Sequence, residues 1–396
     1  MPILSAPSRR RARLGARLGV AALVAALLTP TASAVAEPSP APHSDAVLRR
    51  QLEALVRAPG GPPGIIAVLR DEHRTRVVRA GVAELGTDRK PQVDDHMRIA
   101  STAKAFSGAV ALSLVDRGEL SLDDTLRERL PRLPRAWGAV TLRQLLHHTS
   151  GLPDYSEDPE FLEILLADPR HRFDSRRLLD FIADEPLRFR PGSRYQYSNS
   201  DNIAVALMAE AATGTRYERL LKELVYRPLG LRNTSLPQGY RLPEPYLHGY
   251  DVTPGEPPED VSEILSASGV WASGGIVSTP ADLTRFIRGY ASGALYGRDE
   301  VREQRRWIPG ASEPAGPGRN DAGLAVFRYT TRCGVVLGHT GNFPGYTQLM
   351  AATPDGSRSL TFSATTQINR QVKPELLREL RAVQEDFVCA LLRGKR

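Results

Sequence analysis

Two groups of β-like stretches lie near opposite ends of this chain and are separated by a long middle with no such stretch. Near the N-terminus, apolar runs at 65–69 and 76–82 flank a polar segment, 71–74, and this predicts a hairpin. The second group comes late in the chain, at 323–329, 334–338, 346–352 and 359–365. A chain with this order is expected to form one sheet domain that is interrupted by an insertion.

Apolar residues recur at helical spacing before, between and after the strands. The predicted helices span residues 46–56, 104–117, 142–147, 161–166, 175–183, 202–212, 281–290 and 374–392. The sequence therefore predicts an α/β fold, in which an antiparallel sheet is flanked by N- and C-terminal helices and carries an inserted all-helical subdomain. We expect a sheet lobe at about 46–98 and 268–396, a helical lobe at about 99–267, and reactive groups between them.

The first residues have the features of an export signal. Five arginines between Arg9 and Arg17 precede an apolar stretch at 18–28, and Ala32-Ser33-Ala34 is a small-x-small cleavage pattern. We expect a signal peptide at 1–34, a Pro- and Ala-rich linker at 35–45 and one domain at 46–396. An uncleaved anchor and a twin-arginine route are alternatives, and no later stretch is long and apolar enough to span a membrane.

Charge and composition bear on the partners. The net charge is +7, but the arginines are dispersed and form no stripe with aromatic residues, which argues against a nucleic-acid partner. A basic surface suits an anionic substrate or a cell wall. We find no cluster with metal-ligand spacing and expect no metal or other cofactor. Cys333 and Cys389 permit a disulfide in an exported chain, although two buried thiols are the alternative.

Ser101 and Lys104 form the first of three short elements with reactive side chains. Residues three apart share one face of a helix, so this hydroxyl and amine fall within hydrogen-bond reach. A serine hydroxyl becomes a good nucleophile when a base removes its proton, and a lysine made neutral by burial can be that base. Ser101 also begins the predicted helix, where its N–H is free to donate to an oxyanion. An N-cap serine followed by a surface lysine is the structural alternative.

Two further elements come later in the chain. Tyr197 can act as a base or a proton shuttle beside a cation, and Asn199 can bind a substrate carbonyl. His339 can supply a positive field or a proton, while Gly341 lets a ligand backbone approach the strand. Each element alone is also typical of ordinary structure, such as a packed tyrosine in a turn or a structural histidine on a strand.

The order of these elements is more specific than any one of them. S-x-x-K at 101–104, Y-x-N at 197–199 and H-x-G at 339–341 follow one another in the pattern of the penicillin-recognising serine hydrolases. The segments 145–152, 189–199 and 338–346 also resemble signatures of that family. The resemblance covers about residues 46–392 and is greatest to the secreted actinomycete D-alanyl-D-alanine carboxypeptidases.

This resemblance implies a β-lactamase/transpeptidase-like fold and an acyl-enzyme on Ser101. Lys104 and Tyr197 would share the proton transfers, with the first base left open, and the N–H groups of Ser101 and Asn342 would form the oxyanion hole. It also implies a Cys333–Cys389 disulfide. The residues expected in the site are Ser101, Lys104, Tyr197 and His339 as catalytic groups, and Asn199, Thr340, Gly341, Asn342, Trp271 and Arg328 as substrate-binding groups.

One departure bears on the substrate. The carboxypeptidases hold the substrate carboxylate with an arginine, but Val326 stands where that arginine would fall, and Asn342 replaces a second threonine. An arginine–carboxylate contact is strong and bidentate, so its loss would weaken the grip on a free C-terminus. Arg328 is a candidate replacement.

The sequence therefore predicts a secreted, monomeric serine acyl hydrolase, in the first place a D-alanyl-D-alanine carboxypeptidase that acts on peptidoglycan-type peptides. An esterase or a D-amino-acid amidase on the same scaffold is the alternative, and a β-lactamase or a penicillin-binding sensor is disfavoured. Small peptide or ester substrates, β-lactams as covalent ligands and an association with the cell wall are expected.

Overall fold

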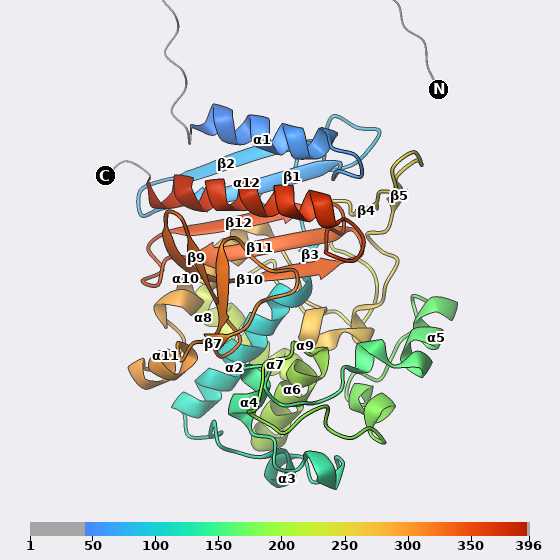
Figure 1. Ribbon diagram of the computed structural model, residues 1–396, viewed down its shortest axis with the longest axis vertical. Coiled ribbons are helices and arrows are strands. Elements are labelled where there is room, and N and C mark those ends of the chain that lie inside the picture. Colours follow the sequence, from blue (N-terminus) through green and yellow to red (C-terminus); the bar gives the residue numbers. More distant parts are fainter. Residues whose placement is uncertain (1–43, 394–396) are drawn as a thin grey trace, which may run out of the picture. The chain divides into compact units, whose positions relative to one another are not determined.

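Eight strands form one antiparallel sheet in the order β2-β1-β12-β11-β10-β9-β8-β7 (Figure 1). The computed structural model describes residues 44–393. The expected signal peptide and nearly all of the expected linker lie outside the described residues. The strands are β1 (Gly64–Arg70), β2 (Thr75–Gly81), β7 (Ile308–Pro309), β8 (Arg319–Ala322), β9 (Phe327–Thr331), β10 (Gly334–Phe343), β11 (Tyr346–Ala352) and β12 (Ser359–Ala364).

The pairing of β1 with β12 joins the two ends of the domain. Ile65 lies opposite Ala364, and Arg70 lies opposite Ser359. β1 also forms the predicted hairpin with β2. Strands from the first and last parts of the chain thus belong to one sheet, and the predicted fold class is confirmed.

Both faces of the sheet are covered, because alternate residues of a strand point to opposite sides. Ile65, Ala67 and Leu69 of β1 join a core with the terminal helices, whereas Ile66 and Val68 join the core shared with the middle of the chain. The terminal helices α1 (Asp45–Arg57) and α12 (Pro374–Leu392) lie side by side across the first face (Figure 1). Helix α10 (Pro280–Ser292) packs on β11 and β12 from the second core.

The middle of the chain contributes helices to the second core. They are α2 (Ala103–Asp116), α3 (Leu126–Arg129), α4 (Leu142–Leu146), α5 (Pro159–Ala167), α6 (Asn199–Thr213), α7 (Tyr217–Leu221) and α8 (Arg227–Leu229). Two short helices follow, α9 (Trp271–Gly274) and α11 (Arg298–Gln304), and the two-residue strands pair as β3 (Met97–Arg98) with β6 (Val277–Ser278) and β4 (Tyr250–Asp251) with β5 (Glu259–Asp260). No helix among the described residues is long and apolar enough to cross a membrane.

Helix α2 lies at the centre of the second core. Every residue from Ala103 to Leu114 is buried, so the helix has no solvent face except near its end. It ends before Gly118, which takes a left-handed φ of +71° that suits a glycine after a helix. A lysine at the start of such a helix is placed inside the protein.

Three sequence predictions about elements need correction. Residues 323–326 are a tight turn between β8 and β9, closed by the Gly323 N–H donating to the Val326 carbonyl (2.8 Å), and not part of a strand. The predicted helix at 175–183 is a short 3-10 segment, Leu178–Ile182. β10 continues five residues beyond the predicted end, because β11 pairs with it as far as Phe343.

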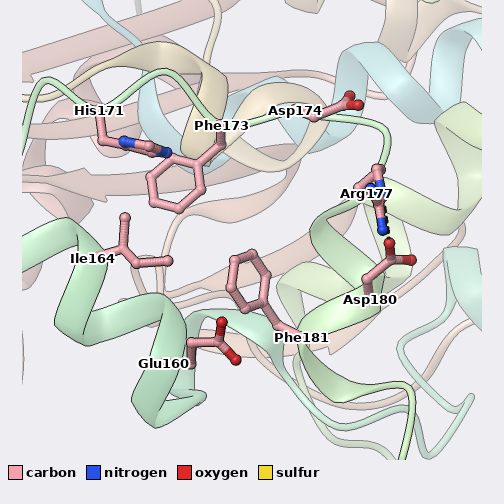
Figure 2. A pocket seen from close by; sticks show the side chains of 8 residues that line it. All are labelled: Glu160, Ile164, His171, Phe173, Asp174, Arg177, Asp180 and Phe181. Carbon is pink, nitrogen blue, oxygen red and sulfur yellow. Dashed lines mark hydrogen bonds and ion pairs between the residues drawn. The ribbon is translucent and has the colours of Figure 1, made fainter.

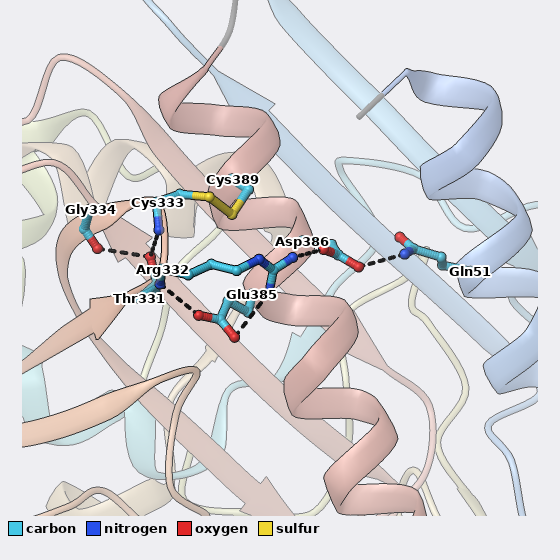
Figure 3. The surroundings of a disulfide bond; sticks show 8 residues. All are labelled: Gln51, Thr331, Arg332, Cys333, Gly334, Glu385, Asp386 and Cys389. Carbon is cyan, nitrogen blue, oxygen red and sulfur yellow. Dashed lines mark hydrogen bonds and ion pairs between the residues drawn. A yellow bond between two sulfur atoms is a disulfide. The ribbon is translucent and has the colours of Figure 1, made fainter. Parts of the chain in front are cut away.

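A disulfide joins Cys333, in the turn between β9 and β10, to Cys389 of α12 (Figure 3). Arg332, beside it, forms ion pairs with Glu385 and Asp386 of the same helix. Asp386 in turn accepts a hydrogen bond from Gln51 of α1. Covalent and ionic contacts therefore fasten the strand turn to both terminal helices.

We expect the double variant Cys333→Ser/Cys389→Ser to lower the free energy of unfolding by about 2–4 kcal/mol, because the bond closes a long loop in the unfolded chain. Denaturant unfolding measures the change. A reductant should lower the stability of the wild-type protein to that of the variant and leave the variant unchanged. Equal stabilities of the two proteins would contradict the prediction.

Candidate active site

Ser101 lies at a sharp turn between β3 and α2. Ala100 has a left-handed φ of +50°, which costs energy for a residue with a side chain, and residues 100–102 form a 3-10 turn that leads into the helix. The Ile99 N–H donates to the Ile276 carbonyl and fixes this turn to the strand beside it. Among the described residues, no backbone carbonyl accepts from the N–H of Ser101. The hydroxyl and the free N–H thus occupy the entrance of a buried helix.

Lys104 is fully buried, and its amine lies close to three oxygens. Nζ is 2.7 Å from Asn199 Oδ1, 2.8 Å from the Ser273 carbonyl and 3.2 Å from Ser101 Oγ. Burial lowers the pKa of Lys104 to about 7, although the charges of Asp154, Glu313 and Asp201 oppose this shift. The amine is therefore neutral in a large fraction of molecules near pH 7.

The neutral amine has two hydrogens and one lone pair, and the neighbouring oxygens determine which of them faces Ser101. The amide oxygen of Asn199 and the carbonyl of Ser273 can only accept, so they take the two hydrogens. The lone pair is then left for the third neighbour, the Ser101 hydroxyl. This arrangement suits removal of the serine proton by Lys104.

Asp154 sets the orientation of Asn199. Its Oδ2 accepts from the backbone N–H of Asn199 (2.8 Å) and from the side-chain Nδ2 (3.1 Å), and Ser156 Oγ accepts the other amide hydrogen. Because a carboxylate can only accept, the amide nitrogen faces Asp154 and the amide oxygen faces Lys104. Both amide hydrogens of Asn199 are thus used within the protein, whereas the resemblance implied that this side chain binds the substrate amide.

Tyr197 lies over the amine of Lys104. Nζ is 4.9 Å from the centre of the phenol ring, and the phenol oxygen is buried with no hydrogen-bond partner among the described residues. Burial raises the pKa of Tyr197 well above its usual range, although the nearby Ser101 hydroxyl opposes the shift. A protonated phenol can donate a proton but cannot begin the reaction as a base.

The buried side chains of His148, Asp201 and Ser150 form a hydrogen-bonded group that packs against Tyr197. The ring of His148 lies 4.5 Å from the ring of Tyr197, and its Nδ1 is 2.8 Å from Asp201 Oδ2. Ser150 donates to the other oxygen of Asp201 (2.5 Å). Burial lowers the pKa of His148 to about 3, so its ring is neutral near pH 7, and burial raises the pKa of Asp201 well above its usual range.

β10 passes directly beside Ser101. A side-chain carbon at Gly341 would lie 2.6 Å from the Ile99 carbonyl and 3.2 Å from the Ser101 nitrogen, so this close approach requires glycine. β9 pairs with β10 only from Gly334 to Gly338, and β11 pairs with it from Leu337 to Phe343. Residues 339–343 therefore have a strand partner on one edge only.

The neighbours of Gly341 on β10 differ in what they offer. His339 is fully buried, its Nε2 has no partner among the described residues, and burial lowers its pKa to about 3. It is neutral near pH 7 and does not supply the positive field that the sequence suggested. Thr340 donates to the Pro314 carbonyl (2.5 Å). The side chain of Asn342 bonds to Thr347, Ile368 and Asn369, so only its backbone remains to contact a ligand.

Two residues predicted to bind substrate are engaged elsewhere. Trp271 is fully buried, and its indole donates to Glu218 (3.0 Å) and packs against Tyr217. Arg328 donates twice to Asp321 Oδ2, at 3.1 and 2.8 Å, and lies over the ring of Trp307. The structure thus brings neither residue into the group around Ser101.

Several residues of this group are not among those predicted from the sequence: Asp154, Ser156, His148, Asp201, Ser150, Ser273 and Glu313. His148 and Ser150 lie within the signature at 145–152, and Asp154 follows it by two residues. Their position in or beside that signature was the one sequence feature that could have identified them as site residues. The carbonyl of Ser273 carries no signal in the sequence, because every residue has a carbonyl.

A separate hollow of about 320 Å³ lies between α5 and the 3-10 segment (Figure 2). Phe173, Phe181 and Ile164 supply its apolar wall, and Arg177 pairs with Asp180 at its edge. The hollow contains none of the residues described around Ser101. Within residues 44–393, no group of three or more His, Cys, Asp or Glu residues is placed to hold a metal ion.

Comparisons with known proteins identify a matching family. Residues 49–384 match the family described as Beta-lactamase. The chain is 26% identical over 319 residues to "Penicillin-binding protein 4*" of Bacillus subtilis (75% of this chain, 67% of that protein) and 29% identical over 256 residues to "D-alanyl-D-alanine-carboxypeptidase/endopeptidase AmpH" of Escherichia coli (63% and 62%). The match thus spans about two thirds or less of these relatives. A D-stereospecific amidohydrolase from Streptomyces sp. has a similar structure, with a TM-score of 0.73, 29% identity and coverage of 85% of this chain and 98% of that chain.

The reaction of Ser101 with a p-nitrophenyl ester should depend on the charge of Lys104. Since the amine is charged below its pKa of about 7, the acylation rate should fall about tenfold for each pH unit below 7 and level off above about 8. Stopped-flow release of p-nitrophenol between pH 5 and 9 measures the profile. Lys104→Arg, which stays charged, should lose about 100-fold or more at every pH. A flat wild-type profile would contradict the assignment of the base.

Replacement of Asp154 by asparagine should move this profile. The negative charge of Asp154 raises the pKa of Lys104, so its removal should shift the ascending limb to lower pH, while the new amide oxygen can still accept from Asn199. Asp158→Asn is the matched control, because Asp158 caps α5 and asparagine caps equally well. An unchanged midpoint in Asp154→Asn, or an equal shift in the control, would refute this role.

Proposed function

Since the chain belongs to the Beta-lactamase family, whose members are serine hydrolases, we propose that it hydrolyses peptide-like amide bonds next to D-amino acid residues through an acyl-enzyme on Ser101. The observation that carries the proposal is the fully buried amine of Lys104, which lies 3.2 Å from Ser101 Oγ and whose pKa burial lowers to about 7.

Each step can be assigned to a group in the site. Lys104 takes the proton of Ser101 as Oγ attacks the carbonyl carbon. The free N–H of Ser101, with that of Asn342, donates to the oxyanion. Tyr197, which its raised pKa keeps protonated, passes its proton to the leaving nitrogen and takes in exchange the proton that Lys104 removed from Ser101. Lys104 is then neutral again. Water attacks the acyl-enzyme, Lys104 accepts its proton, and that proton returns to Ser101 Oγ as the acyl bond breaks.

Within this class we favour an amidase or a peptidase that needs no free carboxylate on its substrate. A carboxypeptidase requires a cation for the terminal carboxylate. Val326 is buried in the turn before β9, Arg328 is paired with Asp321, and His339 is neutral. The similarity to a D-stereospecific amidohydrolase supports this choice.

A D-alanyl-D-alanine carboxypeptidase is the second candidate. The name of AmpH and its 29% identity favour it. In that case Arg328 would have to leave Asp321 when substrate binds. An esterase is also compatible with Ser101, because an ester is easier to cleave than an amide.

We further propose that the protein acts outside the cytoplasm. The predicted signal peptide supports this location, and so does the disulfide between Cys333 and Cys389, since structural disulfides persist in oxidising compartments.

The proposed function can be tested with one set of substrates. A fluorescent penicillin should label the wild-type protein covalently, and Ser101→Ala should abolish the label. The protein should release p-nitroaniline from D-alanine p-nitroanilide faster than D-alanine from a diacyl-D-alanyl-D-alanine peptide. Faster release from the peptide would favour the carboxypeptidase, turnover of p-nitrophenyl esters alone would favour an esterase, and the absence of both label and turnover would refute the proposal.

A further inference from the structure

Several carboxylates lie close enough to the catalytic amine for their charges to act on it. Asp154 is bonded to Asn199, and Glu313 is close enough for its charge to act on Lys104 and on Asp154. Glu157 adds a third charge that Glu313 also senses. Asp154, Glu157 and Glu313 therefore create a negative potential at the group that handles the substrate.

Glu313 lies on a loop that is fastened at several points. Tyr195, two residues before Tyr197, donates to the Ala311 carbonyl (2.6 Å), and Thr340 of β10 donates to the Pro314 carbonyl (2.5 Å). Ser312 donates to the same carbonyl of Pro314 and contacts the hydroxyl of Tyr329. The backbone on either side of Glu313 is thus held against the strand and the segment that form the site.

The carboxylate of Glu313 is exposed and is not used within the described part of the chain, where no hydrogen bond or ion pair involves it. Two arginines of this part of the fold have other partners. Arg328 pairs with Asp321, and Arg381 donates to the carbonyls of Gly316 and Gly318 on the same loop. A held carboxylate with free acceptor positions can bind a cationic ligand.

The polar atoms deeper in the site also indicate a missing ligand. The hydroxyl of Tyr197 and Nε2 of the fully buried His339 have no partner among residues 44–393, and their rings lie 6.5 Å apart. Buried polar groups are rarely left without partners in folded proteins. These atoms are expected to bond to a polar substrate that enters beside Glu313.

We propose that Glu313, with Asp154 behind it, binds a protonated amine next to the scissile carbonyl, so that the enzyme prefers D-amino acid amides and peptides with a free α-amine to N-acylated ones. This inference rests on the proposed function of Ser101. A charged amine donates strongly to a carboxylate, whereas an N-acylated nitrogen carries no charge and leaves Glu313 without a partner.

The test compares D-alanine p-nitroanilide with N-acetyl-D-alanine p-nitroanilide. The wild-type kcat/KM should be about tenfold or more higher for the free amine. Glu313→Gln should lose most of this preference by lowering kcat/KM for the free amine alone. Glu163→Gln, which removes an exposed glutamate of α5, should leave both values unchanged.

Above about pH 8, where Lys104 is neutral in both proteins, acylation by p-nitrophenyl acetate, which has no amine, should be the same in Glu313→Gln as in the wild type and shows that the variant is folded and reactive. A wild-type enzyme that prefers the N-acetyl substrate, or a variant that loses equally on both anilides, would overturn the inference and leave the role of Ser101 intact. If p-nitrophenyl acetate fails to acylate the wild-type protein, the proposed function fails with it.

Discussion

The burial of one uncharged amine, that of Lys104, constrains the structure around it. A lysine without solvent favours the neutral form, and the surrounding oxygens must then match two hydrogens and one lone pair. The amine keeps its ordinary pKa of 10.5 in the unfolded chain, so folding between about pH 7 and pH 10.5 releases a proton. The contribution of this group to stability is full above pH 10.5 and is lost as the pH falls through about 7. The protein thus gives up stability for a base that works near neutrality.

The oxygens that match this amine come from three helices that are distant in sequence. α2 supplies Ser101 and Lys104 at its entrance, α6 begins with Asn199, and α9 contains Ser273. Contacts with no direct role in the reaction hold these helices in position. They include the Asp154 carboxylate and the pair of His148 and Asp201. The strained backbone at Ala100 belongs to the same framework, because its left-handed φ turns the chain into α2. Local strain of this kind persists when the surrounding structure determines it fully.

Periodicity in the sequence predicted most elements because their burial is regular. α12 spans Pro374–Leu392 and β11 spans Tyr346–Ala352, as expected. The prediction failed where tertiary contacts decide, as at residues 323–326, where an apolar run is a turn buried in the core. In the site, the three motifs identified Ser101, Lys104 and Tyr197 as candidates, but side-chain type could not show that Trp271 packs on Tyr217 or that Arg328 is paired with Asp321. Side-chain type also could not show that Asn199 donates its two amide hydrogens to Asp154 and Ser156.

The half-paired strand β10 has a consequence for solubility. A strand with a free edge is a template on which a second polypeptide can add, and this is a common route to aggregation. In this protein residues 339–343 are buried or half-buried, and the loop at 310–318 is fastened to Thr340 through the Pro314 carbonyl. The backbone of β10 can therefore keep an unpaired edge at 339–343 without pairing with a strand from another copy of the chain. The loop therefore protects the protein from aggregation as well as contributing to the site. Shortening the loop would expose the unpaired edge of β10 and favour aggregation, even in a variant that kept its catalytic activity.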